Sequence, residues 1–315
     1  MIPGGGLVQL AVIFINNIAP ILLVAGVGFT LGRRFNIEPK GMSQLIFNAF
    51  SPALVFSSLY TTQVSGGELG AIILATAVFQ LTMGLIAYLA TRLSSASKQD
   101  RAAVMVSAFC FNAGNYGLSL VKFAFGPEVF ARAVIVYIAN VMLNYSLGVF
   151  VASSGRRSPL HALRSVAKVP ALYATAAAFL VTALHIELPL AISRPIELLG
   201  NAAIPCMLIL LGLELGQSVR VTKPRLVGTG VTLRLLVSPL VALVLVSIFA
   251  FQDAATAAFI IQTSMPVAVM TVILATEFNL DHELMVGTIL MSTISSPITL
   301  SVLILLLRTH MPGLT

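Results

Sequence analysis

Two stretches place polar and helix-breaking residues in the middle of apolar runs. The first reads FCFNAGNYGLSL (109–120), and the second reads IIQTSMPVAVMTV (260–272). Amide and hydroxyl side chains offer hydrogen-bond donors and acceptors without charge, so together they can bind a small polar or anionic ligand. The candidate substrate-binding residues are Asn112, Gly114, Asn115, Tyr116, Gln262, Thr263, Ser264, Met265 and Pro266.

Glycine and proline predict that both runs are interrupted helices. Gly114 and Gly117 weaken a helix, and Pro266 lacks an N–H and clashes with the carbonyl four residues earlier. In lipid the freed backbone groups are costly, so such breaks persist only inside protein or beside a water-filled cavity. The half-helix that follows each break presents N–H groups with partial positive charge. We therefore expect a donor-rich site that accepts an anion.

Residues typical of enzymes and metal sites are poorly placed in this chain. All four histidines lie in loops or at the ends of apolar runs, and the sequence contains no H-E-x-x-H or G-x-S-x-G motif. Cys110 and Cys206 lie in separate apolar runs without a nearby histidine, so they are interpreted as packing residues. The sequence predicts a protein that is not an enzyme and has no cofactor or metal.

Composition defines the broad class. Of the 315 residues, 58% are hydrophobic and only 9% are charged, against about 25% charged in a typical soluble domain. The net charge of +7 comes from basic residues in short loops, which indicates membrane orientation and not nucleic-acid binding. The chain is therefore predicted to be a multi-pass protein of the cell (inner) membrane, with the lipid bilayer as its main partner.

Ten apolar runs are long enough to cross a membrane, which takes about 20 residues. They cover residues 7–32, 41–60, 69–91, 102–121, 133–153, 169–186, 196–213, 226–250, 254–276 and 284–307. Thirteen Lys and Arg residues fall in the alternate loops 32–41, 92–101, 154–168 and 214–225. By the positive-inside rule these loops are cytoplasmic, and with ten spans both termini lie outside.

An internal repeat relates the two halves of the chain. Span two contains NAFSP and span seven contains NAAIP, whose first residues, Asn48 and Asn201, are 153 positions apart. Five spans separate the copies, so the halves (1–153 and 169–315, joined by the loop 154–168) must have opposite orientations, as in many secondary transporters. Spans four and nine, which carry the breaks, correspond in the same way. Pro52 and Pro205 are expected to form paired kinks.

Four motifs resemble those of the auxin efflux carrier family: NAGNYGL in span four, TSMPVAV in span nine, and LATEFNLDHEL and STISSPITL after it. The resemblance covers nearly the whole chain. The family includes plant auxin exporters and bacterial carriers proposed for malonate and similar acids. It often has proline where this chain has Ser119, so the break in span four depends on glycine and asparagine alone.

The resemblance implies an all-α fold of ten helices in two inverted five-helix repeats, in which the broken helices four and nine cross. The family is similar in architecture to sodium–bile acid symporters, which implies a scaffold of spans 1, 2, 6 and 7 and a moving core of spans 3–5 and 8–10. The implied function is a carrier of small organic anions, such as auxin-like or dicarboxylic acids, that exports them by an elevator-like movement. The first alternative is a sodium-coupled organic anion symporter, and the second is a channel or membrane sensor. The oligomeric state is left open, with a homodimer as one option.

Three further polar residues lie within the apolar runs. Gln80 is expected to face the crossing, and with Asn140 it is a candidate for ion binding or support of the site. Arg234 lies about eight residues into span eight, and its side chain is expected to reach the membrane interface; the alternative is contact with an anion or a pair with an acid of the core. Asp and Glu are absent from the middle of the core spans, so we expect neither a strong sodium or proton site nor a carboxylate near the substrate.

Overall fold

The computed structural model describes residues 6–62, 64–92, 96–152, 167–217, 222–311 and 313. Within this part the regular structure is helical throughout, and one antiparallel bridge joins Phe111 to Val267. The α-helices are α1 Gly6–Ile13, α2 Ala19–Phe35, α3 Pro39–Leu45, α4 Ser51–Thr61, α5 Gly66–Arg92, α6 Lys98–Phe109, α7 Ser119–Ala124, α8 Pro127–Leu143, α9 Val149–Ala152, α11 Pro170–Ala183, α12 Leu190–Leu215, α13 Pro224–Thr232, α14 Ser238–Ile248, α15 Asp253–Thr263, α16 Thr271–Phe278 and α17 His282–His310. Short π-helical turns, η1 Phe14–Ile18, η2 Ile46–Phe50, η3 Ala113–Leu118, η4 Asn144–Gly148 and η5 Leu233–Val237, connect several of them.

Seven helices in the described part are long and apolar enough to cross a membrane. They are Gly6–Phe35, Pro39–Thr61, Gly66–Arg92, Pro127–Ala152, Leu190–Leu215, Pro224–Ile248 and His282–His310. The predicted sixth span corresponds to α11, which is shorter, with 14 residues, and α12 starts six residues before the predicted position 196. The predicted fourth and ninth spans are each divided into two shorter helices. The chain is thus an all-helical multi-pass membrane protein.

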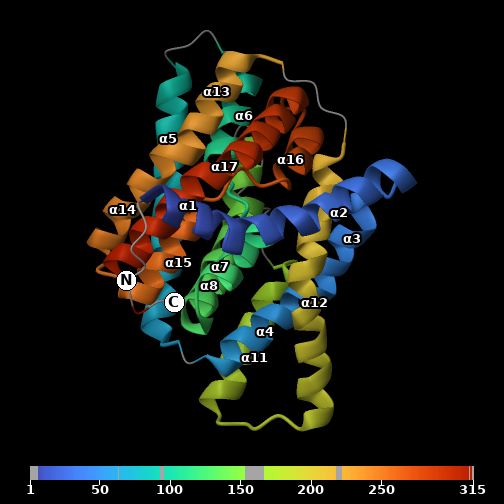
Figure 1. The fold of residues 1–315 in the computed structure, drawn as a ribbon, viewed down its shortest axis with the longest axis vertical. Coiled ribbons are helices and arrows are strands. Elements are labelled where there is room, and N and C mark those ends of the chain that lie inside the picture. The colour runs from blue at the N-terminus through green and yellow to red at the C-terminus, as the bar shows by residue number, and fades with distance from the viewer. Residues whose placement is uncertain are drawn as a thin grey trace.

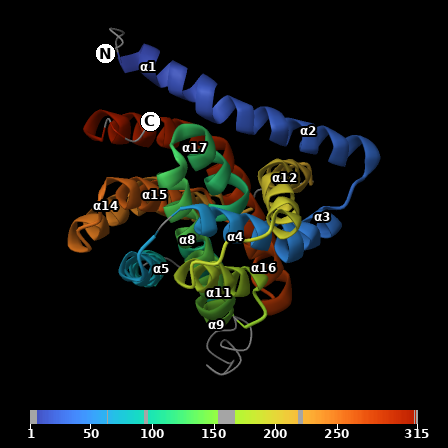
Figure 2. The same cartoon turned by 90° about the horizontal axis from the view of Figure 1, so that it is seen from below.

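The helices form two groups that lie side by side (Figures 1 and 2). In one group α12 packs against α2 and α4, and α11 packs against α4. The other group contains α5, α6, α8, α13, α14, α15 and α17. A methyl group on Gly212 would lie 1.8 Å from the Ala25 carbonyl oxygen, and one on Gly28 would lie 2.1 Å from the Ile209 carbonyl oxygen. Small residues therefore bring the backbones of α2 and α12 into direct contact, as is common between membrane helices.

Three of the π-helical turns end two positions before a proline. Pro20, Pro52 and Pro239 are each the second residue after η1, η2 and η5 respectively. Proline lacks the N–H of the α-helical ladder and its ring crowds the preceding turn, so a wider turn there accommodates it. Pro205, the counterpart of Pro52 in the repeat, lies inside the continuous helix α12. Paired kinks at Pro52 and Pro205 stay a prediction.

Contacts between loops distinguish two ends of the molecule. At one end Lys223 donates to Asp100 and Asp281, at 2.7 and 2.6 Å. Hydrogen bonding to Asp100 and then Asp281 raises the pKa of Lys223. Partial burial opposes ionisation of Asp281, yet hydrogen bonds from Lys223 and from the Leu284 N–H outweigh it, so the pKa of Asp281 is lowered. At the other end Arg132 pairs with Glu68.

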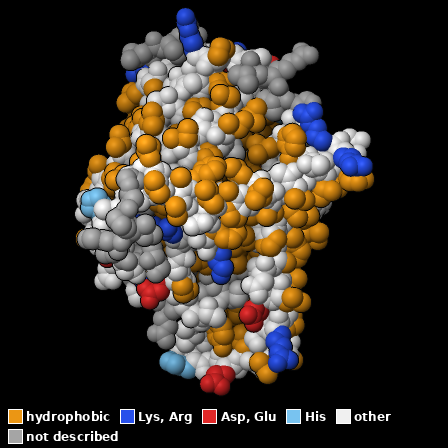
Figure 3. Space-filling model, viewed as in Figure 1, with side chains coloured by type: hydrophobic (Ala, Val, Ile, Leu, Met, Phe, Trp, Pro, Cys, Tyr) orange, Lys and Arg blue, Asp and Glu red, His pale blue; other side chains and the backbone are white. Residues whose placement is uncertain are grey.

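The basic residues predicted to share one side lie partly outside the described residues, which exclude most of the loop 154–168 and Arg220. Those that can be placed are consistent with the prediction, because Lys223 joins the loops that precede α6, α13 and α17. Figure 3 shows hydrophobic side chains over most of the visible face, with charged ones mostly in its upper and lower parts. Large exposed side chains such as Leu81, Leu240 and Ile298 suit contact with lipid.

Candidate functional site

The two interrupted segments meet at their breaks, as expected from the sequence. α6 ends at Phe109 and α15 ends at Thr263, and the extended residues that follow lie antiparallel. The Asn112 N–H donates to the Pro266 carbonyl at 2.9 Å, and the Ala268 N–H donates to the Cys110 carbonyl at 3.0 Å. Each break thus satisfies backbone groups that the other has freed, which makes non-helical backbone tolerable at membrane depth.

Two glycines of the first break lie close to side chains of other segments. A methyl group on Gly117 would lie 2.0 Å from Gln262 Oε1 and 3.1 Å from Met265 Cγ. A methyl group on Gly114 would lie 2.9 Å from the Tyr137 ring, in α8. Ser119 lies at the start of α7, and its hydroxyl donates to the Asn115 carbonyl at 3.1 Å. The break in span four therefore forms without a proline at this position.

Arg234 is fully buried beneath the crossing, so the expectation that its side chain reaches the membrane interface is wrong. Its Nε donates to the Met265 carbonyl at 3.0 Å. Its other nitrogens donate to the Ser238 hydroxyl and to the carbonyls of Ala108 and Thr263.

The partners of Arg234 explain why a buried cation is stable there. Ala108 and Thr263 lie at the C-terminal ends of α6 and α15, where unpaired carbonyls carry partial negative charge. The planar guanidinium can donate to several of these carbonyls at once. It also lies over the rings of Phe79 and Phe111, 5.6 and 5.5 Å from their centroids. Arg234 thus joins the ends of both broken segments.

A second polar network supports the first break from the side of α5 and α8. Gln80 donates to the amide oxygens of Asn140 and Asn144, at 2.8 and 3.3 Å. Asn140 in turn donates to the Phe111 carbonyl at 3.0 Å. Gln80 therefore reaches the crossing through Asn140, as expected. A role for either residue in ion binding stays a prediction.

A cavity of about 640 Å³ lies between the two groups of helices, next to the crossing. The first break contributes Asn112, Gly114 and Asn115 to its wall, and the second contributes the backbone region 268–270. η2 and α12 close the opposite side with Asn48 and Glu214. The Ala113 N–H donates to the Phe111 carbonyl at 2.9 Å, whereas the other N–H groups of the first turn of η3 have no acceptor inside their own helix, so the break offers these as donors at the wall.

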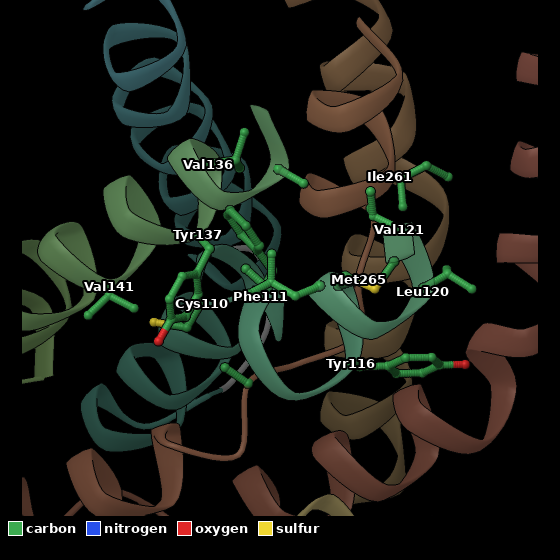
Figure 4. Packing of buried hydrophobic residues seen from close by; sticks show 14 of the residues in the cluster. Cys110, Phe111, Tyr116, Leu120, Val121, Val136, Tyr137, Val141, Ile261 and Met265 are labelled. Carbon is green, nitrogen blue, oxygen red and sulfur yellow. The ribbon is translucent and has the colours of Figure 1, made fainter. Parts of the chain in front are cut away.

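Several predicted site residues lie behind the cavity wall and not on it. They are Tyr116, Gln262, Thr263, Ser264, Met265 and Pro266, all buried. Figure 4 shows Tyr116 pointing away from Tyr137, a residue of the cavity wall. Gln262 donates to the Ala133 carbonyl at 3.1 Å, and Thr263 donates to the Phe259 carbonyl at 2.6 Å. These contacts hold the crossing together, and direct binding of a substrate by this group stays a prediction.

Glu214 is the cavity residue that sequence reasoning missed. The sequence predicts that it lies in the loop 214–225, whereas α12 extends to Leu215 and places it in the cavity wall. Its carboxyl and the Asn115 amide both belong to residues that line this cavity, where α12 packs against η3. The expectation that no carboxylate lies near the site is therefore wrong. The signal in the sequence was the unbroken run LILLGLEL, which a helix can continue through Glu214.

The cavity also carries basic side chains. Lys40 and His282 line its wall, and the Asn112 Nδ2 is buried without an acceptor among the described residues. Within the same part of the chain, no three His, Cys, Asp or Glu residues are grouped so that they could hold a metal ion. The wall thus combines uncharged donors, two basic side chains and one acid, a chemistry suited to reversible binding of a small polar ion.

An all-helical membrane protein with two interrupted helices that meet beside a central cavity has the architecture of a transporter. The chain matches the family model described as membrane transport protein over residues 13–304, and it belongs to this family, the auxin efflux carrier family. It is similar to an uncharacterized transporter of Methanothermobacter thermautotrophicus, 29% identical over 92% of this chain and 94% of the relative. An uncharacterized transporter of Methanocaldococcus jannaschii is 24% identical over 81% of this chain and 85% of the relative.

Proposed function

We propose that this transporter is a carrier of small organic anions, and that the cavity beside the crossing is its substrate site. The observation that carries the proposal is the position of Asn112, Gly114 and Asn115 in the cavity wall at the start of a half-helix. Uncharged amides and free backbone N–H groups stabilise a carboxylate. The described wall carries no arginine, so a weakly held carboxylate suits it better than a phosphate.

The proposed movement is elevator-like, with ten crossing segments arranged as two inverted repeats. The group of α2, α4, α11 and α12 corresponds to the scaffold implied by the family resemblance, and the second group corresponds to the moving core. The cavity lies between the groups, so a sliding movement of one against the other would carry a substrate bound at the break. Lys40, His282 and Gln217 lie at the end of the molecule that carries Lys223, which is the proposed cytoplasmic opening.

Energetics favour export. An inside-negative potential of about 100 mV favours outward movement of a monoanion by about 2.3 kcal/mol, roughly a fifty-fold concentration ratio. Import of the same anion against that potential would require at least two monovalent cations per cycle. The proposed carrier is therefore electrogenic and independent of sodium.

The experiment is charge movement in proteoliposomes on addition of malonate or indole-3-acetate, with and without sodium. Asn112→Ala and Asn115→Ala should weaken the apparent affinity, because each removes an amide from the cavity wall. Gln252→Ala is the matched control, an exposed amide at the start of α15. Ser264→Ala tests whether a hydroxyl behind the wall affects affinity as well.

Each alternative predicts a different result. Transport that strictly requires sodium would replace the proposal with a sodium-coupled symporter. Flux that does not saturate with substrate would indicate a channel, and binding without flux would indicate a sensor. Equal affinities in Asn112→Ala, Asn115→Ala and the control would move the substrate site away from the first break.

A further inference from the structure

Glu214 creates a conflict at the proposed site, and this inference rests on the proposed function. An anion held by Asn115 would share the cavity with the carboxyl of Glu214, which lies on α12 where that helix packs against η3. Two negative charges confined to one cavity repel each other, so keeping both charged costs free energy. Either the anion is excluded or the carboxyl becomes neutral.

The surroundings of Glu214 favour the second outcome. Its Oε2 is buried and has no hydrogen-bond partner among the described residues, so a proton there would not displace an existing bond. The cavity wall around it is mixed in charge and large enough for a small acid. A neutral carboxyl could also donate a hydrogen bond to the incoming carboxylate, which an ionised one could not.

Other titratable groups face the same space. Lys40 of α3, Tyr137 of α8, Tyr145 of η4 and His282 of α17 line the cavity. Arg33 of α2 donates to the Gly216 carbonyl at 3.1 Å, two residues beyond Glu214. The remaining elements packed on α12, namely η2, η3 and α4, carry no Asp, Glu, Lys, Arg or His. Among the described residues that line the cavity, Glu214 is the one acid.

We propose that Glu214 is a proton-binding site of the cavity, which takes up one proton when an organic anion binds next to Asn115. The proton comes from water and remains on the Glu214 carboxyl, so the cavity gains no net charge. Since α12 belongs to the proposed scaffold, the proton returns to the same side when the anion leaves. The charge moved per cycle then remains that of the anion.

Binding of indole-3-acetate and of malonate, measured separately by calorimetry between pH 6 and pH 8, tests this site. In the wild-type protein the Kd should rise with pH by up to about tenfold per pH unit, the limit for one linked proton. Repeating the measurement in buffers of different ionisation enthalpy should show uptake of close to one proton per ligand. Glu214→Gln should bind at all pH values with a flat profile and no proton uptake beyond that of the ligand itself.

Two controls make the result specific. Glu38→Gln removes an exposed acid at the start of α3 and should keep the wild-type profile. His282→Gln removes the histidine of the cavity wall, and it should also keep the proton uptake. A profile that is flat in the wild type, unchanged in Glu214→Gln, or abolished by His282→Gln alone would overturn the proton site and leave the carrier proposal standing.

Failure of both acids to bind or move would instead overturn the carrier proposal and the anion half of this inference. Infrared difference spectra, measured without any ligand, then decide whether Glu214 binds a proton. A protonated-carboxyl band that titrates in the wild type and is absent from Glu214→Gln would keep Glu214 as a proton site. Identical spectra for the two proteins would remove it.

Discussion

The guanidinium of Arg234 donates hydrogen bonds to carbonyls at the ends of two half-helices, which would otherwise need water or a bound cation as a partner. It donates to carbonyls of both broken segments and to Ser238, which itself donates to Thr263 at 2.7 Å. A buried acceptor that loses its donor costs about 1–3 kcal/mol, so several acceptors depend on this one side chain. At the scale of single residues, one arginine therefore satisfies several of the acceptors at the crossing.

Replacing Arg234 by Met should strongly destabilise the protein, because the carbonyls of Ala108 and Met265 lose their donor and the carbonyl of Thr263 loses one of its two donors. We expect a loss of about 3–5 kcal/mol, measured as a lower midpoint of thermal unfolding in detergent. Arg234→Lys keeps the charge but loses the planar arrangement of donors, so its unfolding midpoint should lie between those of the wild type and Arg234→Met. Arg225→Met, at an exposed position of α13, is the control. Equal midpoints for Arg234→Met and Arg225→Met would show that the carbonyls do not need the guanidinium.

At the scale of elements, close backbone contact between α2 and α12 makes that pair the tightest part of its group. Gly28 and Gly212 face backbone atoms of the opposite helix, which cannot move aside as a flexible side chain could. Gly26, two residues from Gly28 on the same helix, faces open space. The two positions therefore differ in surroundings but not in secondary structure.

Gly28→Ala should destabilise the protein by about 1–3 kcal/mol or more, because the added methyl overlaps the Ile209 backbone. Gly26→Ala should be neutral or slightly stabilising, since alanine favours a helix. Thermal unfolding of both variants in the same detergent measures the difference. A Gly28→Ala protein as stable as Gly26→Ala would mean that the helices separate at little cost.

Lys223 joins the starts of α6 and α17, and its contribution depends on pH. The lowered pKa of Asp281 gives stability above its ordinary pKa of about 4, and this stability is lost as the pH falls. The raised pKa of Lys223 gives stability that is present below its ordinary pKa of about 10.4 and is lost as the pH rises above it. The pair is therefore effective across neutral pH.

Lys223→Met should lower the unfolding midpoint at pH 7 by less than about 4 °C, because Lys223 is largely exposed and solvent screens the pair. As the pH falls from 7 to 3 the variant and the wild type should approach each other, since the stability due to the lowered pKa of Asp281 is lost as this carboxyl takes up a proton. Lys98→Met, in α6, serves as control. A difference that stays constant from pH 7 to pH 3 would contradict the assigned charge interaction.

The breaks could be predicted from the sequence because glycine, proline and asparagine act on their own backbone. Gly117 and Pro266 mark the places where a helix stops, whatever lies around them. The partners of Arg234 and the place of Glu214 could not be predicted, because both depend on helices that are distant in sequence. Arg234 meets Ala108 across 126 positions, and Glu214 meets Asn115 only where α12 packs against η3.

At the scale of the whole molecule, the orientation of the interrupted segment 253–278 decides the number of crossings. Neither α15 nor α16 is long enough to span a bilayer alone, with 11 and 8 residues. If together they form one crossing, the loops at their two ends lie on opposite sides. The inverted arrangement of the two halves depends on this point.

Cysteine labelling in intact cells tests the crossing. Cys110 and Cys206 are first replaced by alanine, and single cysteines are then placed at Gln252 and His282, both exposed. Gln252→Cys should react with an impermeant reagent from outside, and His282→Cys only after the membrane is opened. Arg225→Cys, at the predicted cytoplasmic end, is the reference for the inside. Labelling of both test positions from the same side would rule out ten crossings.

Arg234 also constrains the order in which the chain assembles during synthesis. A lone arginine near the middle of a membrane helix opposes insertion by about 2.5–3.5 kcal/mol. When the segment Pro224–Ile248 leaves the ribosome, Ala108 and Ser238 are already made, whereas Thr263 and Met265 are not. The nascent chain must therefore hold the helix Pro224–Ile248 beside α6 until α15 has been synthesised. If the ribosome stalled before residue 263, the helix Pro224–Ile248 would be the least securely inserted part of the protein.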